Sequence, residues 1–139
     1  MAEMDEREFK RRTKRAALEV LALVERLPTK RMTVSVIARQ LARCGTSVGE
    51  NYRASCRGKS LPDVISKLGD AEEEADETLY WMELLVEGGY IQESEIAPLY
   101  REYDEILAML VASIKTLRKR LELEAEQKRD RQQAPKSKI

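Results

Sequence analysis

Arginine side chains recur along one predicted helix, between residues 33 and 58, at a spacing that could bring them to phosphate groups. Their offsets of 4, 10 and 4 residues place four arginines within one broad helical face, and a lysine follows just beyond them. The set is Arg39, Arg43, Arg53, Arg57 and Lys59. A row of guanidinium groups binds phosphates well, but it would equally suit the carboxylates that recur between Asp70 and Glu77 on the next predicted helix. The sequence leaves phosphate binding and structural pairing both open.

Further basic clusters stand near the ends of predicted helices, at residues 10–15, 30–31, 118–120 and 128–131. Each cluster alone is typical of a solvated helix end. Together they could form a basic rim if an oligomer repeated them, because phosphate attraction grows with the number of cations on one surface. We therefore add Arg118, Lys119 and Arg120 to the candidate nucleic-acid-binding residues. Aromatic residues make up only 5% of the chain, which argues against recognition by base stacking.

The side chains that most catalytic and metal sites need are missing. The chain has no histidine, which excludes Ser–His and Cys–His nucleophile pairs and the Glu-x-x-His ligands of di-iron bundles. The acidic run at residues 72–77 would be spread around a helix axis and would not converge on a cation. There is also no glycine-rich phosphate loop of the Walker type. We expect a protein without catalytic residues, metal or cofactor.

The elements that position these residues are long helices. The chain has 139 residues, enough for one domain, and 36% of them are charged, a composition typical of helical proteins. Apolar periodicity and punctuation by proline, glycine and capping residues predict helices over about 5–26, 33–58, 60–88 and 94–124, with Thr33, Ser60 and Ser94 as possible caps. Short connections predict an all-α, antiparallel up-down-up-down four-helix bundle over residues 1–124. Residues 125–139 are expected to be a charged, disordered C-terminal tail.

Two composition features bear on location and redox state. No apolar run approaches the roughly 18 residues of a membrane span, and the charged start lacks the apolar core of a secretory signal, so we expect a cytoplasmic protein. Cys44 and Cys56 would lie roughly 18 Å apart on one helix, too far for a disulfide. Each is expected to be a small buried residue or a bystander.

The zero net charge hides a strong segregation along the sequence. The net charge is +3 over residues 1–31, +4 over 32–59, −10 over 60–100 and +3 over 101–139. Such blocks predict either neighbouring helices that attract each other or a molecule with opposite poles. We favour attraction between helices, the ordinary use of such blocks.

Two local features are candidates for a subunit interface. Gly45 and Gly49 lie four residues apart inside the second predicted helix and would let another backbone approach closely, although tight packing within the bundle or a local helix break would explain them as well. The third predicted helix is apolar almost all round near Tyr80, Trp81 and Leu84, whereas a monomeric bundle helix needs only one stripe. Tyr and Trp are enriched at interfaces, but an aromatic residue covering one end of the bundle is the alternative.

Several motifs resemble one known family over about residues 8–120. They are Ile37-Ala38-x-Gln40-Leu41, Ser47-Val48-Gly49-Glu50-Asn51-Tyr52, the Lys59-Ser60 turn and Glu77-Thr78-x-Tyr80-Trp81. They resemble the small four-helix-bundle proteins encoded in intervening sequences of bacterial large-subunit rRNA genes. The resemblance implies a ring-shaped homopentamer with no established enzymatic activity. It marks Glu50, Asn51 and Glu77 as family positions without giving them a chemical role.

A related branch of that family comprises the accessory variability proteins of diversity-generating retroelements. These are similar bundles that associate with a reverse transcriptase and with nucleic acid, and they tend to be strongly basic, whereas this chain is neutral. The sequence therefore predicts a noncatalytic, homo-oligomeric accessory protein that binds RNA or DNA through basic patches. The alternative is a structural or protein-interaction module in which the arginines pair with acidic side chains and do not meet phosphate.

Overall fold

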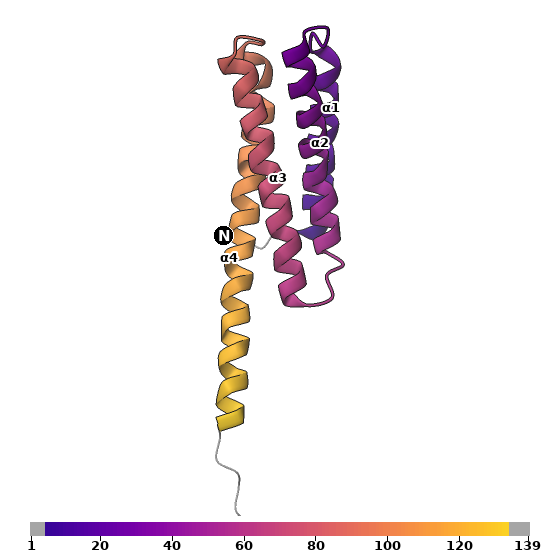
Figure 1. Cartoon of the computed structure of the whole chain (residues 1–139). Coiled ribbons are helices and arrows are strands. Elements are labelled where there is room, and N and C mark those ends of the chain that lie inside the picture. The colour runs from indigo at the N-terminus through magenta and orange to yellow at the C-terminus, as the bar shows by residue number, and fades with distance from the viewer. Residues whose placement is uncertain (1–4, 134–139) are drawn as a thin grey trace, which may run out of the picture.

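The chain folds into four helices and no strands over residues 5–133, the part that the computed structural model describes (Figure 1). The helices are α1 (Glu6–Arg26), α2 (Met32–Ser55), α3 (Leu61–Glu87) and α4 (Glu93–Gln133). The predicted all-α four-helix bundle is confirmed. Within the described residues, no helix combines the length and the hydropathy that a membrane-spanning segment needs.

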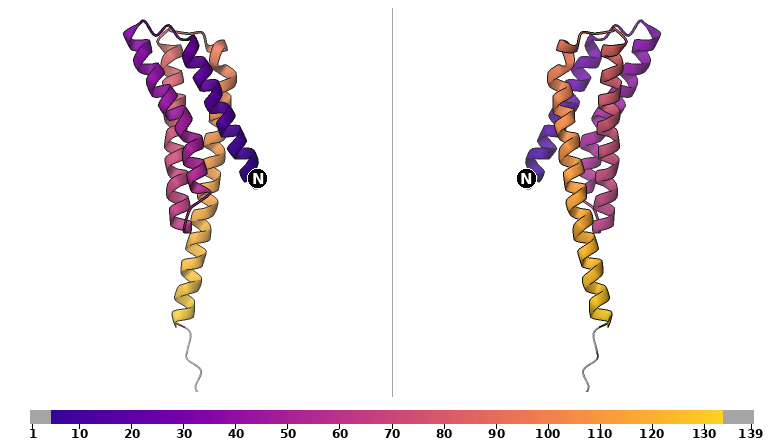
Figure 2. Two further views of the ribbon diagram at one scale, coloured as in Figure 1. Left: turned by 90° about the vertical axis from the view of Figure 1, so that its right-hand side faces the viewer. Right: turned by 90° about the vertical axis from the view of Figure 1, so that its left-hand side faces the viewer.

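Consecutive helices run antiparallel, so the α1–α2 and α3–α4 turns lie at the same end of the bundle (Figure 1). The contact between α2 and α3 is the most extensive, followed by α3 with α4 and α1 with α2. By contrast, α1 crosses α4 at an angle and shares few contacts with it (Figure 2). The bundle is therefore held most firmly along α2, α3 and α4, and α1 depends mainly on its packing against α2.

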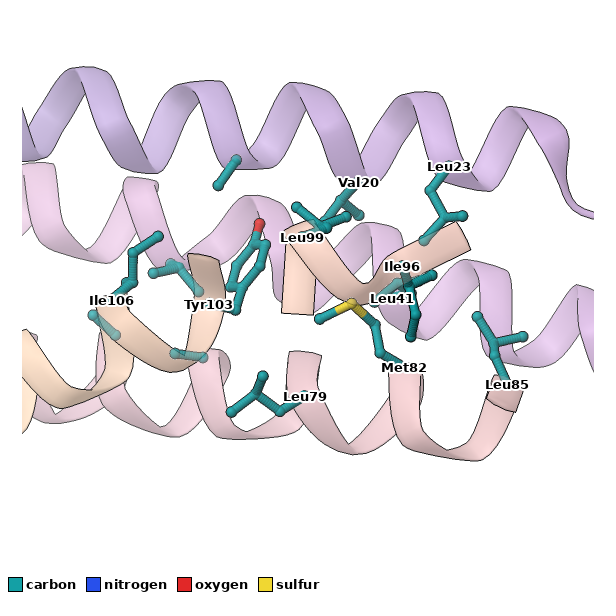
Figure 3. Packing of buried hydrophobic residues seen from close by; sticks show 14 of the residues in the cluster. Val20, Leu23, Leu41, Leu79, Met82, Leu85, Ile96, Leu99, Tyr103 and Ile106 are labelled. Carbon is teal, nitrogen blue, oxygen red and sulfur yellow. The ribbon is translucent and has the colours of Figure 1, made fainter. Parts of the chain in front are cut away.

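All four helices contribute to one apolar core. Val20, Leu41, Met82 and Tyr103, one from each helix, point into the same interior (Figure 3). The buried Tyr103 hydroxyl donates a hydrogen bond of 2.9 Å to the Gly45 carbonyl oxygen, so its polar atom is satisfied inside the core. The apolar stripes of the sequence thus mark the faces that meet in the bundle.

The helix ends follow the predicted caps in part. Ser60 accepts a 3.2 Å hydrogen bond from the Asp63 backbone N–H, and the Asp63 carboxylate accepts one of 3.1 Å from the Lys59 N–H, a reciprocal box. Thr33 does not cap α2, which begins one residue earlier without a side-chain cap. Ser94 is not the cap of α4 either: the helix begins at Glu93, and the Glu95 carboxylate accepts a 2.7 Å hydrogen bond from the backbone N–H of Gln92.

The last helix is longer than the sequence predicts. Residues 125–133, expected to belong to a disordered tail, continue α4 as a helix that extends beyond the other three (Figure 1). No glycine or proline interrupts residues 99–133, and Arg120 pairs with Glu124 at 3.3 Å across one turn, so local propensity and ion pairing favour the helix after the apolar stripe has ended. The rest of the expected tail, residues 134–139, lies outside the described residues.

Candidate functional site

A basic groove lies between α1 and α2, close to the N-terminal end of α1. Its volume is about 710 Å³. Five of its lining residues are cationic and one is acidic; the lining consists of Lys10, Arg11, Thr13, Lys14, Ala17, Thr46, Gly49, Glu50, Arg53 and Arg57. We call this the α1/α2 basic groove.

Small residues on both helices create the groove. A Cβ atom at Gly49 would lie 3.1 Å from the Thr13 hydroxyl oxygen, closer than most Cβ contacts, so glycine at this position favours the close approach of α1 to α2. Lys10 and Lys14 stand one turn apart on α1, and Arg53 and Arg57 stand four residues apart at the end of α2. Residues one turn apart share a helix face, so the close approach of the backbones brings both cationic pairs to one groove.

The cations of the groove differ in how far they are neutralised. Lys10 pairs with Glu6 at 3.0 Å and Arg11 pairs with Glu8 at 2.9 Å, both within the exposed surface of α1. Over residues 5–133, no carboxylate lies within 4.0 Å of the charged groups of Lys14, Arg53 or Arg57. These three cations are free to meet an anionic ligand.

The predicted arginine row does not act as a unit. Arg43 reaches across to α3, where its guanidinium lies 3.3 Å from Glu74 and 3.4 Å from Glu77. This is the structural pairing that the sequence left open. Arg39 is exposed and has no such partner in the described part of the chain, while Arg53 and Arg57 belong to the groove.

The other predicted cations lie elsewhere. Lys59 is exposed in the turn between α2 and α3, and its backbone N–H is part of the cap of α3. Arg118, Lys119 and Arg120 are exposed on the last part of α4, where Arg120 pairs with Glu124. Neither set lines the groove.

Three cations of the groove were not among the predicted site residues. Lys10, Arg11 and Lys14 look in the sequence like one more basic helix end, and nothing local connects them with Arg53 or Arg57. One signal for this site is present in the sequence. Thr13 and Ala17 on α1 are small, as are the glycines of α2, and small residues on two helices favour their close approach. Whether the cations of α1 and α2 reach the same groove depends also on the rotation of each helix about its axis, which the sequence does not give.

Gly45 and Gly49, predicted as interface candidates, are both buried under α1. A Cβ atom at Gly45 would lie 3.0 Å from both Cγ atoms of Val20 and 3.3 Å from the Tyr103 hydroxyl. The helix α2 is continuous through this region. Both glycines are buried and serve packing inside the bundle, and Gly49 also lines the α1/α2 basic groove.

The other interface candidates do reach the surface. Tyr80 is 54% exposed and stacks edge-on against Trp81 at a ring separation of 5.5 Å, while Trp81 and Leu84 are half-buried. The Arg43–Glu77 pair sets the register of the antiparallel helices α2 and α3. The exposed residues Val36 and Met32 precede Arg43 by 7 and 11 residues, a spacing that keeps them on the same face of α2 and brings them to the level of these three residues. We call this set the α2/α3 apolar surface; it consists of Met32, Val36, Tyr80, Trp81 and Leu84.

Both cysteines are free thiols without features of a reactive site. Cys44 is buried in the core and Cys56 is half-buried. Burial raises the pKa of each thiol, and a raised pKa disfavours the thiolate that acts as nucleophile or metal ligand. In residues 5–133 no three Cys, Asp or Glu side chains are grouped so that they could hold a metal ion.

A smaller groove of about 410 Å³ lies between α3 and α4. Its carboxylates are Glu83, Glu87 and Glu93, and Arg101 is its one cation. The Tyr100 hydroxyl donates a 2.9 Å hydrogen bond to Glu83, and burial together with this carboxylate raises the pKa of Tyr100 to about 12. The groove is acidic, in contrast to the groove between α1 and α2.

Comparison with known proteins identifies the family. A family model described as 23S rRNA-intervening sequence protein matches residues 6–112. A solved structure of a protein with unknown function, from the S23 ribosomal protein family of Bacteroides thetaiotaomicron VPI-5482, is 31% identical with a TM-score of 0.73; the match covers 81% of this chain and 99% of that chain. No curated protein matches the sequence. The family that the motifs indicate is therefore confirmed: the chain belongs to the 23S rRNA-intervening sequence protein family.

Proposed function

We propose that the protein is a noncatalytic, cytoplasmic accessory protein that binds the phosphate backbone of RNA or DNA through the α1/α2 basic groove. The observation that carries the proposal is the convergence of Lys14, Arg53 and Arg57 on one groove without a carboxylate within 4.0 Å in residues 5–133. Unneutralised cations in a concave surface attract phosphates, and arginine can bind them with two parallel hydrogen bonds.

The chemistry of the groove favours the backbone over the bases as its ligand. None of its lining residues is aromatic, so it has no platform on which a base could stack. Phosphate contacts carry no sequence information by themselves. Binding is therefore expected to depend weakly on sequence and strongly on salt.

The distribution of ion pairs supports this function over a purely structural use of the arginines. Within the described residues only Arg12 and Arg43 pair with carboxylates of another helix. Structural pairing therefore accounts for Arg43 alone among the predicted arginines, and it does not explain the cations of the α1/α2 basic groove. The competing class is a protein-interaction module, in which an acidic protein would occupy the groove instead of nucleic acid.

Assembly is the second part of the proposal. The α2/α3 apolar surface combines the exposed Met32, Val36 and Tyr80 with the half-buried Trp81 and Leu84, and such an aromatic and aliphatic surface is typical of one that buries against a partner. We infer a homo-oligomer, and the family resemblance suggests a pentamer. An oligomer would repeat the basic groove, and this would raise the affinity for a long polyanion.

The test is a salt titration of binding to a structured RNA, a DNA duplex and an acidic polypeptide. If three phosphate contacts are made, the nucleic-acid affinity should fall about 40-fold between 50 and 200 mM salt. Lys14→Ala, Arg53→Ala and Arg57→Ala, combined in one variant, should weaken binding and flatten this dependence by about one unit of slope per lost contact.

The matched control removes three exposed cations outside the groove, through Arg26→Ala, Lys30→Ala and Arg101→Ala. It has the same net charge as the groove variant and should bind nearly as the parent does. Equal loss in the two triple variants would show that only net charge matters and would contradict a site in the groove. Preference for the acidic polypeptide over both nucleic acids would favour the protein-interaction module.

A further inference from the structure

The outer face of α1 exposes apolar side chains that the core does not use. Leu18 is 62% exposed, and it lies on one stripe with Arg11, Arg15 and Ala22. The spacing of these four residues is 4, 3 and 4, the spacing of a heptad stripe. The stripe is basic in its first half and apolar in its second.

The outer face of α3 carries a stripe of the same spacing. Glu73, Glu77, Tyr80 and Leu84 also follow at intervals of 4, 3 and 4. The two acidic residues are exposed, Tyr80 is 54% exposed and Leu84 is half-buried. This stripe is acidic in its first half and apolar in its second, and it overlaps the α2/α3 apolar surface.

The two stripes are complementary when α1 and α3 lie parallel. The cations at 11 and 15 then face the carboxylates at 73 and 77, while Leu18 faces Tyr80. An antiparallel arrangement would instead place cations opposite apolar side chains and leave the carboxylates opposite leucine and alanine. The complementarity therefore selects one orientation.

The match cannot be made within one chain. In the bundle α1 and α3 share no contacts over the described residues, because they occupy opposite corners. They do point the same way, since both run toward the end that holds the α1–α2 and α3–α4 turns (Figure 1). A neighbouring copy in the same orientation can thus present its α1 in parallel to α3.

The local ion pairs do not block this contact. Arg11 pairs with Glu8, and Arg15 lies 3.8 Å from Glu19, but both are exposed pairs within one helix and are worth little. Glu73 has no cation within 4.0 Å in residues 5–133, and Glu77 shares Arg43 with Glu74. The carboxylate side of the contact is therefore only partly neutralised within the chain.

We propose that these stripes are the two halves of one heterologous subunit contact, in which α1 of one copy packs in parallel against α3 of the next. The inference rests on the homo-oligomer of the proposed function. It shares Arg11 with the lining of the α1/α2 basic groove, and its test contains no nucleic acid. A contact between two different surfaces leaves one half free on each end of a growing assembly, and it closes into a ring when the rotation between copies allows.

The test uses two variants that each damage one half, Leu18→Glu and Tyr80→Glu, with solution mass measured by light scattering after size exclusion. Each variant alone should lose the oligomer and elute with the mass of one chain. An equimolar mixture should form a heterodimer and nothing larger, because the intact α1 of the Tyr80→Glu chain meets the intact α3 of the Leu18→Glu chain. Val111→Glu, at a 44% exposed valine outside both stripes, should keep the parent mass.

A charge exchange provides a second measurement that does not depend on the apolar positions. Arg11→Glu and Glu73→Arg should each weaken the oligomer, and both changes in one chain should restore it, because every contact regains one pair of opposite charges. This holds even if an apolar variant fails to fold.

The outcomes separate the two proposals. A parent protein that stays at the mass of one chain at all concentrations overturns the assembly itself. A parent oligomer that survives Leu18→Glu, or a mixture that forms no heterodimer together with no rescue by the double charge exchange, overturns the α1–α3 contact and leaves the assembly standing.

Discussion

At the scale of single residues, the neighbouring arginines 11 and 12 of α1 have different partners: Arg11 pairs with Glu8 of its own helix, whereas Arg12 reaches α4. Arg12 donates hydrogen bonds of 2.7 to 3.0 Å to both carboxylate oxygens of Glu102 and a further one to Glu105, with a quarter of its side chain exposed. The hydrogen bonds to Glu102 raise the pKa of Arg12, so the guanidinium stays charged. Because α1 and α4 share few other contacts, this cluster is their main polar link.

Arg12→Ala should lower the free energy of unfolding by about 1–3 kcal/mol, since it removes partly buried charged hydrogen bonds and leaves Glu102 without its partner. Arg11→Ala removes an exposed pair on the same helix and should change stability by less than about 0.5 kcal/mol. Urea denaturation of both variants checks the difference. A similar effect of the two substitutions would contradict a structural role for the Arg12 cluster.

At the scale of helices, the glycines show how position decides what a residue does. A Cβ atom at Gly45 would contact Val20 and Tyr103, whereas a Cβ atom at Gly69, in the first half of α3, would have no atom within 4 Å. One glycine therefore serves the approach of two helices, and the other merely weakens the helix that contains it.

Gly69→Ala should stabilise the protein by about 0.5–1 kcal/mol, because alanine gains helix propensity and meets open space. Gly45→Ala should destabilise it by about 1–3 kcal/mol, since Val20 is fully buried and β-branched and has little freedom to move aside. The midpoints of thermal or chemical unfolding compare the two. Stabilisation by Gly45→Ala would show that α1 packs more loosely against α2 than these distances imply.

Much of the helical structure could be predicted because its signals are local. Apolar residues such as Leu41 and Tyr52 repeat with the period of a helix, and the predicted cap Ser60 forms a box with Asp63. The start of α2 and the length of α4 differ from prediction. At those places cap and tail signals were weak, and helix propensity with ion pairing extended the helices further than the apolar pattern.

At the scale of the whole molecule, few side chains of the charged blocks form ion pairs between helices within residues 5–133. Helix α3 carries nine acidic side chains and one basic one, yet within residues 5–133 only Arg43 bridges to it from another helix. The favoured expectation, that the blocks pair between helices, therefore accounts for a small part of the segregation. The molecule presents a basic groove on α1 and α2 and an acidic groove on α3 and α4.

The end of α4 should be dispensable for the stability of the single bundle. Residues 122–133 are all exposed, so truncation after Leu121 should change the free energy of unfolding by less than about 0.5 kcal/mol. Truncation after Val111 also removes Ile114, which is 3% exposed, and should cost more than about 2 kcal/mol. Denaturation of both truncated chains measures this. A large loss from the shorter truncation would indicate that the extension contacts another part of the assembly.

The sequence by itself determined the four helices and the faces that they bury, because helix periodicity is read from residues close together in the chain. Its motifs indicated the family by resemblance. Only the tertiary structure decided which cations are paired and which are free. Arg43, Arg53 and Arg57 lie on one helix, yet the first meets α3 and the others meet the groove beside α1. That division depends on how each helix is rotated and how closely it approaches its neighbour. Side-chain volumes at Thr13, Gly45 and Gly49 set the rotation of α2 and the distance between α1 and α2.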